Sequence, residues 1–210
     1  MSIAQAKLKT AKRKEYEIKA AFIYNFLKFI DWPPEKPDEI SSDTQDTNKE
    51  NKDKANNVIT IGLVAEREVY DVCKLIHGKK VKKKTIQVVL FDSLTEKDLR
   101  QGDRSKKVKV LRECDILFIC AGQQSKSTQA DYRKILMALK GLNILTIGEM
   151  NGFIEPVKTK DPCGIINFVI EGNKVRFEIN LDMAQRSGFQ VKAQLLKLAK
   201  RVIKKEKPTK

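Results

Sequence analysis

Residues that carry catalysis or metal binding are scarce in this chain. It has one histidine, His77, and four cysteines, Cys73, Cys114, Cys120 and Cys163, and no two cysteines form a CxxC pair. A zinc site is therefore not expected. With one histidine, a Ser-His or Cys-His nucleophile is difficult to build. The motifs GxGxxG, GxxxxGK[ST], GxSxG and HExxH are also missing, so the sequence argues against an enzyme.

Long apolar runs are missing as well. No run reaches the ~18 residues of a membrane span, and the N-terminus MSIAQAKLKTAKRKEYE has no apolar segment of the kind that a signal peptide needs. Two interpretations stay open: a cytosolic protein, or the mature form of an exported one with an added Met.

Arginine is scarce relative to lysine. The formal net charge is +15, and of the 42 basic residues 9 are Arg and 33 are Lys. Recognition of phosphates and bases relies strongly on the Arg fork, and single-strand binders interleave Arg with aromatic residues, which is not seen here. The basic charge is therefore predicted to be dispersed and solvated. A basic cytosolic nucleic-acid-binding domain remains the alternative that charge alone favours.

Apolar runs and turn residues predict strands that alternate with helices. With 210 residues and a hydrophobic fraction of 41%, the chain suits one domain. Alternation implies right-handed crossovers and a mainly parallel sheet covered by helices on both faces, an α/β fold. Strands are expected at Val58–Val64, Ile86–Phe91, Cys114–Cys120 and Asn143–Ile147, and helices at Arg13–Ile30, Glu66–His77, Glu96–Arg100 and Ser127–Leu139.

The stretch from Gly164 to Ile203 predicts a C-terminal antiparallel β-hairpin and a terminal helix. Gly172-Asn173 suits a two-residue primed turn, and Asn180 can cap a short helix that Gly188 ends. The turn would pair Ile170 with Val175, Phe168 with Phe177, and Ile166 with Ile179. Helical spacing of five apolar residues then predicts a long last helix: Val191, Leu195, Leu198, Ala199 and Val202.

The first helix has an apolar stripe that includes Phe22, Phe26 and Phe29, predicted to be core or dimer interface. Asn25 lies within the stripe. It could contact a ligand, but a hydrogen bond to neighbouring backbone is the favoured interpretation. The rest of the stripe is Ile18, Ala21 and Ile30, and Asp31-Trp32-Pro33-Pro34 ends the helix.

The domain prediction has four parts. Residues 1–15 are expected to be a flexible tail, 16–203 a single domain and 204–210 a basic tail. Within the domain, residues 33–57 have no aromatic residue and only Ile40 as a large aliphatic one, which predicts a mobile polar insertion.

A few charged residues remain as candidates. Asp92, Asp115 and Glu149 lie near the ends of predicted strands, where each suits a cap or turn as well as chemistry. His77 is expected to be solvated in the last turn of its helix. The five lysines within Lys79–Lys84 could meet phosphate, but such a run is more often a solvated turn.

Two stretches resemble the YfiR family. KAAFIYNFLKFIDWP, Lys19 to Pro33, is similar to its N-terminal signature, and INFVIEGNKVRFEINLDMAQRSGFQVKAQLLKLAKRV to its C-terminal one. LTIGE followed by Phe153 and Cys163-Gly164-Ile165-Ile166 matches a segment between them. The resemblance extends from Tyr16 to Ile203, and its motif residues are Phe22, Tyr24, Asn25, Lys28, Phe29, Trp32, Pro33, Gly164, Phe177, Glu178 and Asn180.

This resemblance implies a non-enzymatic regulatory protein of the bacterial periplasm, often dimeric. Such a protein binds the periplasmic part of a membrane-anchored diguanylate cyclase and inhibits it, which lowers cyclic di-GMP signalling, and it can respond to oxidation through disulfides. The resemblance implies no catalytic residue, cofactor, metal or nucleic-acid partner.

The cysteines are the redox candidates. Cys114 and Cys120 cannot pair along one strand, because six residues separate them by about 20 Å, beyond the ~7 Å limit between α-carbons. The family resemblance implies a bridge between Cys73 and Cys114. Cys120 and Cys163 are then the remaining pair, although Cys163 has no clear family counterpart. The alternative is four reduced thiols.

Overall fold

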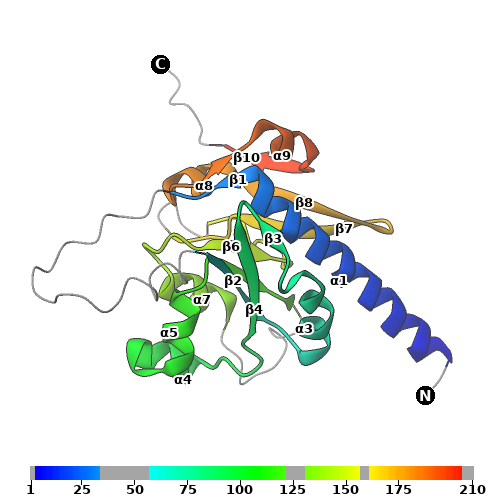
Figure 1. Ribbon diagram of the computed structural model, residues 1–210, viewed down its shortest axis with the longest axis horizontal. Helices are drawn as coiled ribbons and strands as arrows, with labels where there is room; N and C mark the ends of the chain where they lie inside the picture. The colour runs from blue at the N-terminus through cyan, green and yellow to red at the C-terminus, as the bar shows by residue number, and fades with distance from the viewer. Residues whose placement is uncertain (1–2, 34–56, 122–130, 157–160, 205–210) are drawn as a thin grey trace, which may run out of the picture.

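A mixed eight-stranded sheet forms the centre of the protein (Figure 1). A computed structural model describes residues 3–33, 57–121, 131–156 and 161–204. The strand order is β10-β8-β7-β6-β5-β2-β4-β3. The strands are β2 (Val58–Val64), β3 (Lys80–Val81), β4 (Lys84–Leu90), β5 (Ile116–Ile119), β6 (Leu145–Gly148), β7 (Ile166–Glu171), β8 (Lys174–Asn180) and β10 (Arg201–Ile203).

The sheet is mainly parallel, which confirms the predicted fold class. β2 pairs in parallel with both β4 and β5, and the pairs β5–β6, β6–β7 and β8–β10 are parallel too, whereas β3–β4 and β7–β8 are antiparallel hairpins. From β2 the chain crosses to β4 on one side and then returns past β2 to β5 on the other. The carboxyl ends of β2 and β5 therefore flank a topological switch point, where open α/β sheets commonly bind ligands.

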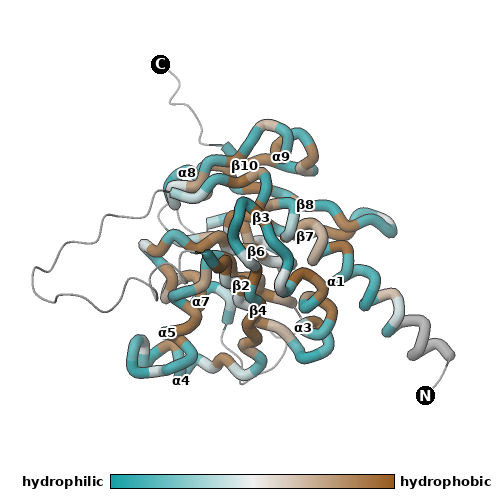
Figure 2. The backbone as a smooth tube through the Cα atoms, in the orientation of Figure 1, coloured by the Kyte–Doolittle hydropathy of each residue, from teal (hydrophilic) through white to brown (hydrophobic). Residues whose placement is uncertain are grey.

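Helices cover both faces of the sheet and enclose two separate apolar cores. Because side chains alternate along a strand, Phe118 of β5 packs in the core beneath α1, whereas Leu117 packs in the opposite core. The most hydrophobic stretches lie in the central strands (Figure 2). The first face carries α1 (Ile3–Phe29), α3 (Arg67–Cys73) and a 3-10 turn (Lys74–Ile76), and the second carries α4 (Glu96–Gln101), a 3-10 turn (Gly102–Arg104), α5 (Lys106–Arg112) and α7 (Tyr132–Ala138).

Helix α1 is longer than predicted, and its buried face is rotated. It begins at Ile3, so the part of the expected tail that the structure describes is helical, in line with its Ala, Lys, Gln and Arg content. Ile18 is 45% exposed and Asn25 is exposed as well, which contradicts their predicted places in the buried stripe. The buried face comprises Tyr16, Lys19, Ala20, Ile23, Phe26, Leu27 and Ile30. The predicted stripe left out Lys19, whose polar side chain lies on the buried face.

The β7–β8 hairpin has the predicted register, with Ile170 opposite Val175, Phe168 opposite Phe177 and Ile166 opposite Ile179. Only the first loop residue, Gly172, has a positive φ, +57°, as a type II′ turn requires. Helix α8 (Leu181–Arg186) follows, and its first turn is capped by Asn180, whose side chain accepts a hydrogen bond from the Met183 amide at 2.8 Å.

The prediction of a long last helix is wrong. Gln190–Val191 forms β9, which pairs with β1 (Ile30–Asp31), and the helix α9 spans only Ala193–Leu198. The chain then becomes extended, and β10 adds to β8 in parallel, with the Lys200 amide donating to the Phe177 carbonyl at 2.8 Å. The otherwise unpaired edge of β8 offers backbone hydrogen bonds that outweigh the helical spacing, so β10 and not the hairpin forms this edge of the sheet.

The remaining predictions differ in their bounds. Helix α5 was not expected, and α7 begins at Tyr132 instead of Ser127, with Ser127 to Ala130 outside the described residues. The predicted insertion at 33–57 also lies outside them, apart from Pro33 and Asn57.

Candidate functional site

A buried acid lies at the carboxyl ends of the central strands. Glu149 directly follows β6, and its Oε1 accepts hydrogen bonds from the Tyr16 hydroxyl at 2.7 Å and from the Ala121 amide at 2.8 Å. Its Oε2 pairs with the Lys19 ammonium at 2.5 Å, and Lys19 also pairs with Glu15. The Lys19 and Glu149 side chains are 3% and 7% exposed. This network joins α1 to the ends of β5 and β6.

Burial and charge set the protonation of the network. Burial disfavours the Lys19 ammonium, but Glu149 and Glu15 outweigh burial, so the pKa of Lys19 is raised. Burial, together with Cys120 and Glu149, raises the pKa of Tyr16. At neutral pH the network therefore holds a lysine cation and a protonated tyrosine around Glu149. A buried ion pair of this kind is costly to break, because removing one partner leaves the other charged and unpaired.

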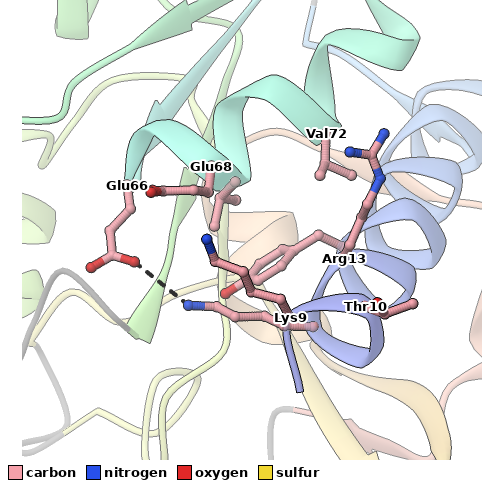
Figure 3. A pocket seen from close by; sticks show the side chains of 9 residues that line it. Lys9, Thr10, Arg13, Glu66, Glu68 and Val72 are labelled. Carbon is pink, nitrogen blue, oxygen red and sulfur yellow. Dashed lines mark ion pairs between the residues drawn. The ribbon is translucent and has the colours of Figure 1, made fainter. Parts of the chain in front are cut away.

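An open pocket of about 400 Å³ lies beside the network, between the first half of α1 and the start of α3. Figure 3 shows Lys9 of α1 on the side of Glu66 and Glu68, whereas the Arg13 side chain extends towards Val72. The dashed line is the Lys12–Glu66 ion pair, 3.5 Å long. Because Glu66 follows β2, the pocket lies near the carboxyl end of that strand. Its walls of opposite charge could hold a small polar molecule.

Two cysteines adjoin the same network. Cys73 ends α3, Cys120 follows β5, and both belong to the core beneath α1. Burial raises the pKa of Cys73 to about 12, with a contribution from Glu149. Burial also raises the pKa of Cys120, and both Glu149 and Cys73 add to that shift. These thiols are protonated at neutral pH and are therefore poor nucleophiles.

The predicted Cys73–Cys114 bridge is absent, because all four cysteines are free. Cys114 lies on the other face of the sheet, in the core that contains α5, where its thiol donates to the Val110 carbonyl at 3.3 Å. The sheet separates it from Cys73. Cys163 is not joined to Cys120 either, and its sulfur accepts a hydrogen bond from the Asn180 amide group at 3.4 Å.

The other candidates lie apart from this network. Asp115 precedes β5, at the amino ends of the strands, and accepts a hydrogen bond from the Thr60 amide at 2.7 Å. Asp92 is exposed after β4. His77 is exposed, and its Nδ1 accepts a hydrogen bond from the Val88 amide at 3.2 Å. Of the three carboxylates, Glu149 is the one that belongs to the buried network.

The family-motif residues mostly hold the fold together. Trp32 packs edge-on against Phe189 at 5.6 Å. Gly164 leaves room for the Phe153 ring, with which a Cβ would collide. Asn180 also donates to the Ile154 carbonyl at 2.8 Å. Phe22 and Phe177 pack on each other, Pro33 lies against Gly188, and Glu178 is paired with Arg201. The other four lie on α1: Tyr24 and Lys28 on its outer side, Asn25 on its surface, and Phe29 half-buried near its end.

Tyr16 and Lys19 were missed as site residues. Their signal was present, because a lysine and a tyrosine three positions apart line the face that also holds Ile23, Phe26 and Ile30. The sequence did not reveal their partner, because Glu149 lies 130 residues from Lys19 along the chain.

The chain belongs to the YfiR/HmsC-like family, whose sequence profile matches residues 16–200. Members of this family are generally non-enzymatic regulators. No curated protein matches the chain. Among the described residues, no helix is long and apolar enough to cross a bilayer.

One solved structure that matches part of the chain is the ABC domain in complex with L-Trp from Streptococcus pneumonia. It has 14% sequence identity and a TM-score of 0.45, and the match covers 70% of this chain and 56% of that chain.

Proposed function

We propose that this protein is a non-enzymatic periplasmic regulator that binds a membrane-anchored diguanylate cyclase and inhibits it, lowering cyclic di-GMP signalling. The observation that carries the proposal is the family match over residues 16–200. The motif residues support it, because most of them pack, cap or pair within the fold and none forms a catalytic set with the buried Glu149. The family resemblance also supports a homodimer, which light scattering on purified protein would test.

One surface suits a protein partner. Phe22 of α1 packs on Phe177 and Phe168 of the hairpin, with ring centroids 5.4 and 6.1 Å apart. Ile18 lies one turn before Phe22, and Ile170 lies on the same face of β7 as Phe168. Ile18 is 45% and Ile170 is 52% exposed. We call these three residues, Ile18, Phe22 and Ile170, the α1–hairpin surface, and propose that the periplasmic part of the cyclase covers it.

The proposal is tested by reconstituting the full-length cyclase in vesicles, with this protein added on its periplasmic side. Cyclic di-GMP formation from GTP should fall as the protein is titrated, and the heat-denatured protein should have no effect. An unchanged rate at saturating protein, with no binding to the cyclase, would contradict the proposed function.

The response to oxidation is proposed to involve Cys73 and Cys120. They share one core and the pKa of one thiol responds to the other. Their two thiols would lose two protons and two electrons to a dithiol oxidase of the compartment and form one S–S bond. Both are buried, so α1 or α3 must open first. Non-reducing peptide mapping of oxidised protein should find these two joined, and finding them free or joined to other cysteines would contradict this pairing.

A further inference from the structure

A concentration of lysines occupies one edge of the sheet. Residues 74–84 hold six lysines and no acidic residue. They follow α3 and form the β3–β4 hairpin, which is among the hydrophilic parts of Figure 2. We call five exposed side chains here, one of them from α1, the lysine patch: Lys28, Lys74, Lys79, Lys80 and Lys83.

Tyr24 brings the α1 and hairpin lysines together. The Lys28 ammonium lies 4.4 Å and the Lys79 ammonium 5.8 Å from the centre of its ring. Its hydroxyl donates to the Lys80 carbonyl at 3.2 Å. The two ammonium groups near one ring repel each other and create a local positive electrostatic potential. An anion bound there would reduce this repulsion.

The patch has few carboxylates to neutralise it. Within the described residues, Lys82 pairs with Asp31 at 2.6 Å and donates to the Ile30 carbonyl at 2.8 Å, and no ion pair joins a lysine of the patch to a carboxylate. Elsewhere, basic residues are commonly paired. On the other face of the sheet, Lys107 pairs with Asp98, Arg112 with Asp103 and Lys134 with Glu96.

The turn between β3 and β4 carries two lysines in a backbone conformation that lysine rarely adopts. Lys82 and Lys83 both have positive φ, 47° and 68°, values at which Asn and Gly are preferred in a two-residue turn. Two lysines at these positions cost stability. Lys82 has a structural role through Asp31 and Ile30, whereas Lys83 is exposed and adds its charge to the patch.

We propose that the lysine patch binds the anionic phospholipid headgroups of a membrane surface. Lysines are strongly hydrated point charges that suit a fluid layer of phosphates, whereas sequence or base recognition uses the Arg fork and free aromatic faces. The patch contains no Arg, and lysines already occupy the face of Tyr24. The inference does not depend on the cyclase, since it requires only lipid.

The test is co-sedimentation of the full chain with vesicles of phosphatidylglycerol and phosphatidylcholine, and with phosphatidylcholine alone. The variant is Lys79→Glu/Lys80→Glu/Lys83→Glu, which leaves Lys82 in place. The matched control is Lys97→Glu/Lys106→Glu/Lys109→Glu, which changes the same charge at exposed positions of α4 and α5. Circular dichroism melts check that both variants fold.

Wild type and control should bind the anionic vesicles and not the neutral ones, and 0.5 M salt, ~4 Å in Debye length, should release them. The patch variant should bind at least about tenfold more weakly. Equal loss in both variants would show that only net charge matters, and absence of wild-type binding would also overturn the proposal. Tighter binding to duplex DNA than to vesicles, lost in the patch variant, would assign the patch to nucleic acid instead.

Discussion

The two faces of the sheet both carry a buried apolar core, but the cores differ in composition. The face under α5 and α7 is mostly aliphatic, and the nearby ion pairs Lys107–Asp98, Arg112–Asp103 and Lys134–Glu96 lie at the surface or are only partly buried. The face under α1 holds a cluster of aromatic rings, a buried lysine–glutamate pair, two thiols and half-exposed isoleucines. The face under α1 therefore combines groups that hold the fold with the exposed isoleucines on which the proposed binding surface rests.

The largest effect is expected from the aromatic cluster under α1. Phe26 is fully buried, and its ring lies 5.1 to 6.1 Å from those of Phe177, Phe168 and Phe22. Phe26→Ala should lower the free energy of unfolding by about 3–5 kcal/mol in urea titration. An unchanged unfolding midpoint would rule out a core role, and loss of a dimer with an intact fold would make Phe26 an interface residue.

Breaking the buried ion pair should cost almost as much. Glu149→Gln leaves the Lys19 charge buried without its main partner, for an expected loss of about 3–5 kcal/mol. The double variant Lys19→Met/Glu149→Leu removes both charges and should lose less. On the other face, Arg112→Ala breaks the exposed pair with Asp103 and should cost less than about 1 kcal/mol. A double variant that is less stable than Glu149→Gln would contradict the assigned role of the pair.

The second core should be sensitive to added volume. A methyl group at Gly164 would collide with the ring of Phe153, so Gly164→Ala should cost about 1–3 kcal/mol through overpacking. Phe153→Leu in the same chain should recover part of that loss, because it removes the ring. Two losses that simply add would show that the collision is not the cause.

The smallest expected effect is the pH dependence of the free energy of unfolding that comes from the titratable side chains beneath α1. The folded state raises the pKa of Tyr16, of Lys19 and of both thiols, Cys73 and Cys120, so it favours their protonated forms. This stabilisation is complete below their unfolded values, about 8.5 for Cys, 10 for Tyr and 10.4 for Lys, and is lost as pH rises through the folded values.

Unfolding free energies at pH 8 and pH 10.5 should therefore show a fall at the higher pH. Tyr16→Phe should reduce that fall. Equal pH dependence in Tyr16→Phe and wild type would contradict the assignment.

Local signals predicted the elements, while long-range contacts determined the site. Strand β2 was predicted with its observed bounds, Val58–Val64, because β-branched residues and flanking polar ones define it. The hairpin register followed from Gly172-Asn173 and side-chain alternation. Lys19, however, is buried only because Glu149 receives it, and β10 is a strand only because β8 has an open edge. The side of the sheet on which Cys114 lies was likewise not encoded locally.

The most direct test of the account is binding of the cyclase's periplasmic part to Ile18→Asp/Ile170→Lys. Both positions are about half exposed, so the variant should melt close to wild type. The matched control is Met137→Lys, 54% exposed on α7 of the opposite face. Calorimetry should show binding weakened at least about tenfold in the double variant, a loss of ~1.4 kcal/mol, and unchanged binding in the control. Wild-type affinity in the double variant would contradict the assignment of the regulatory surface to the α1 face.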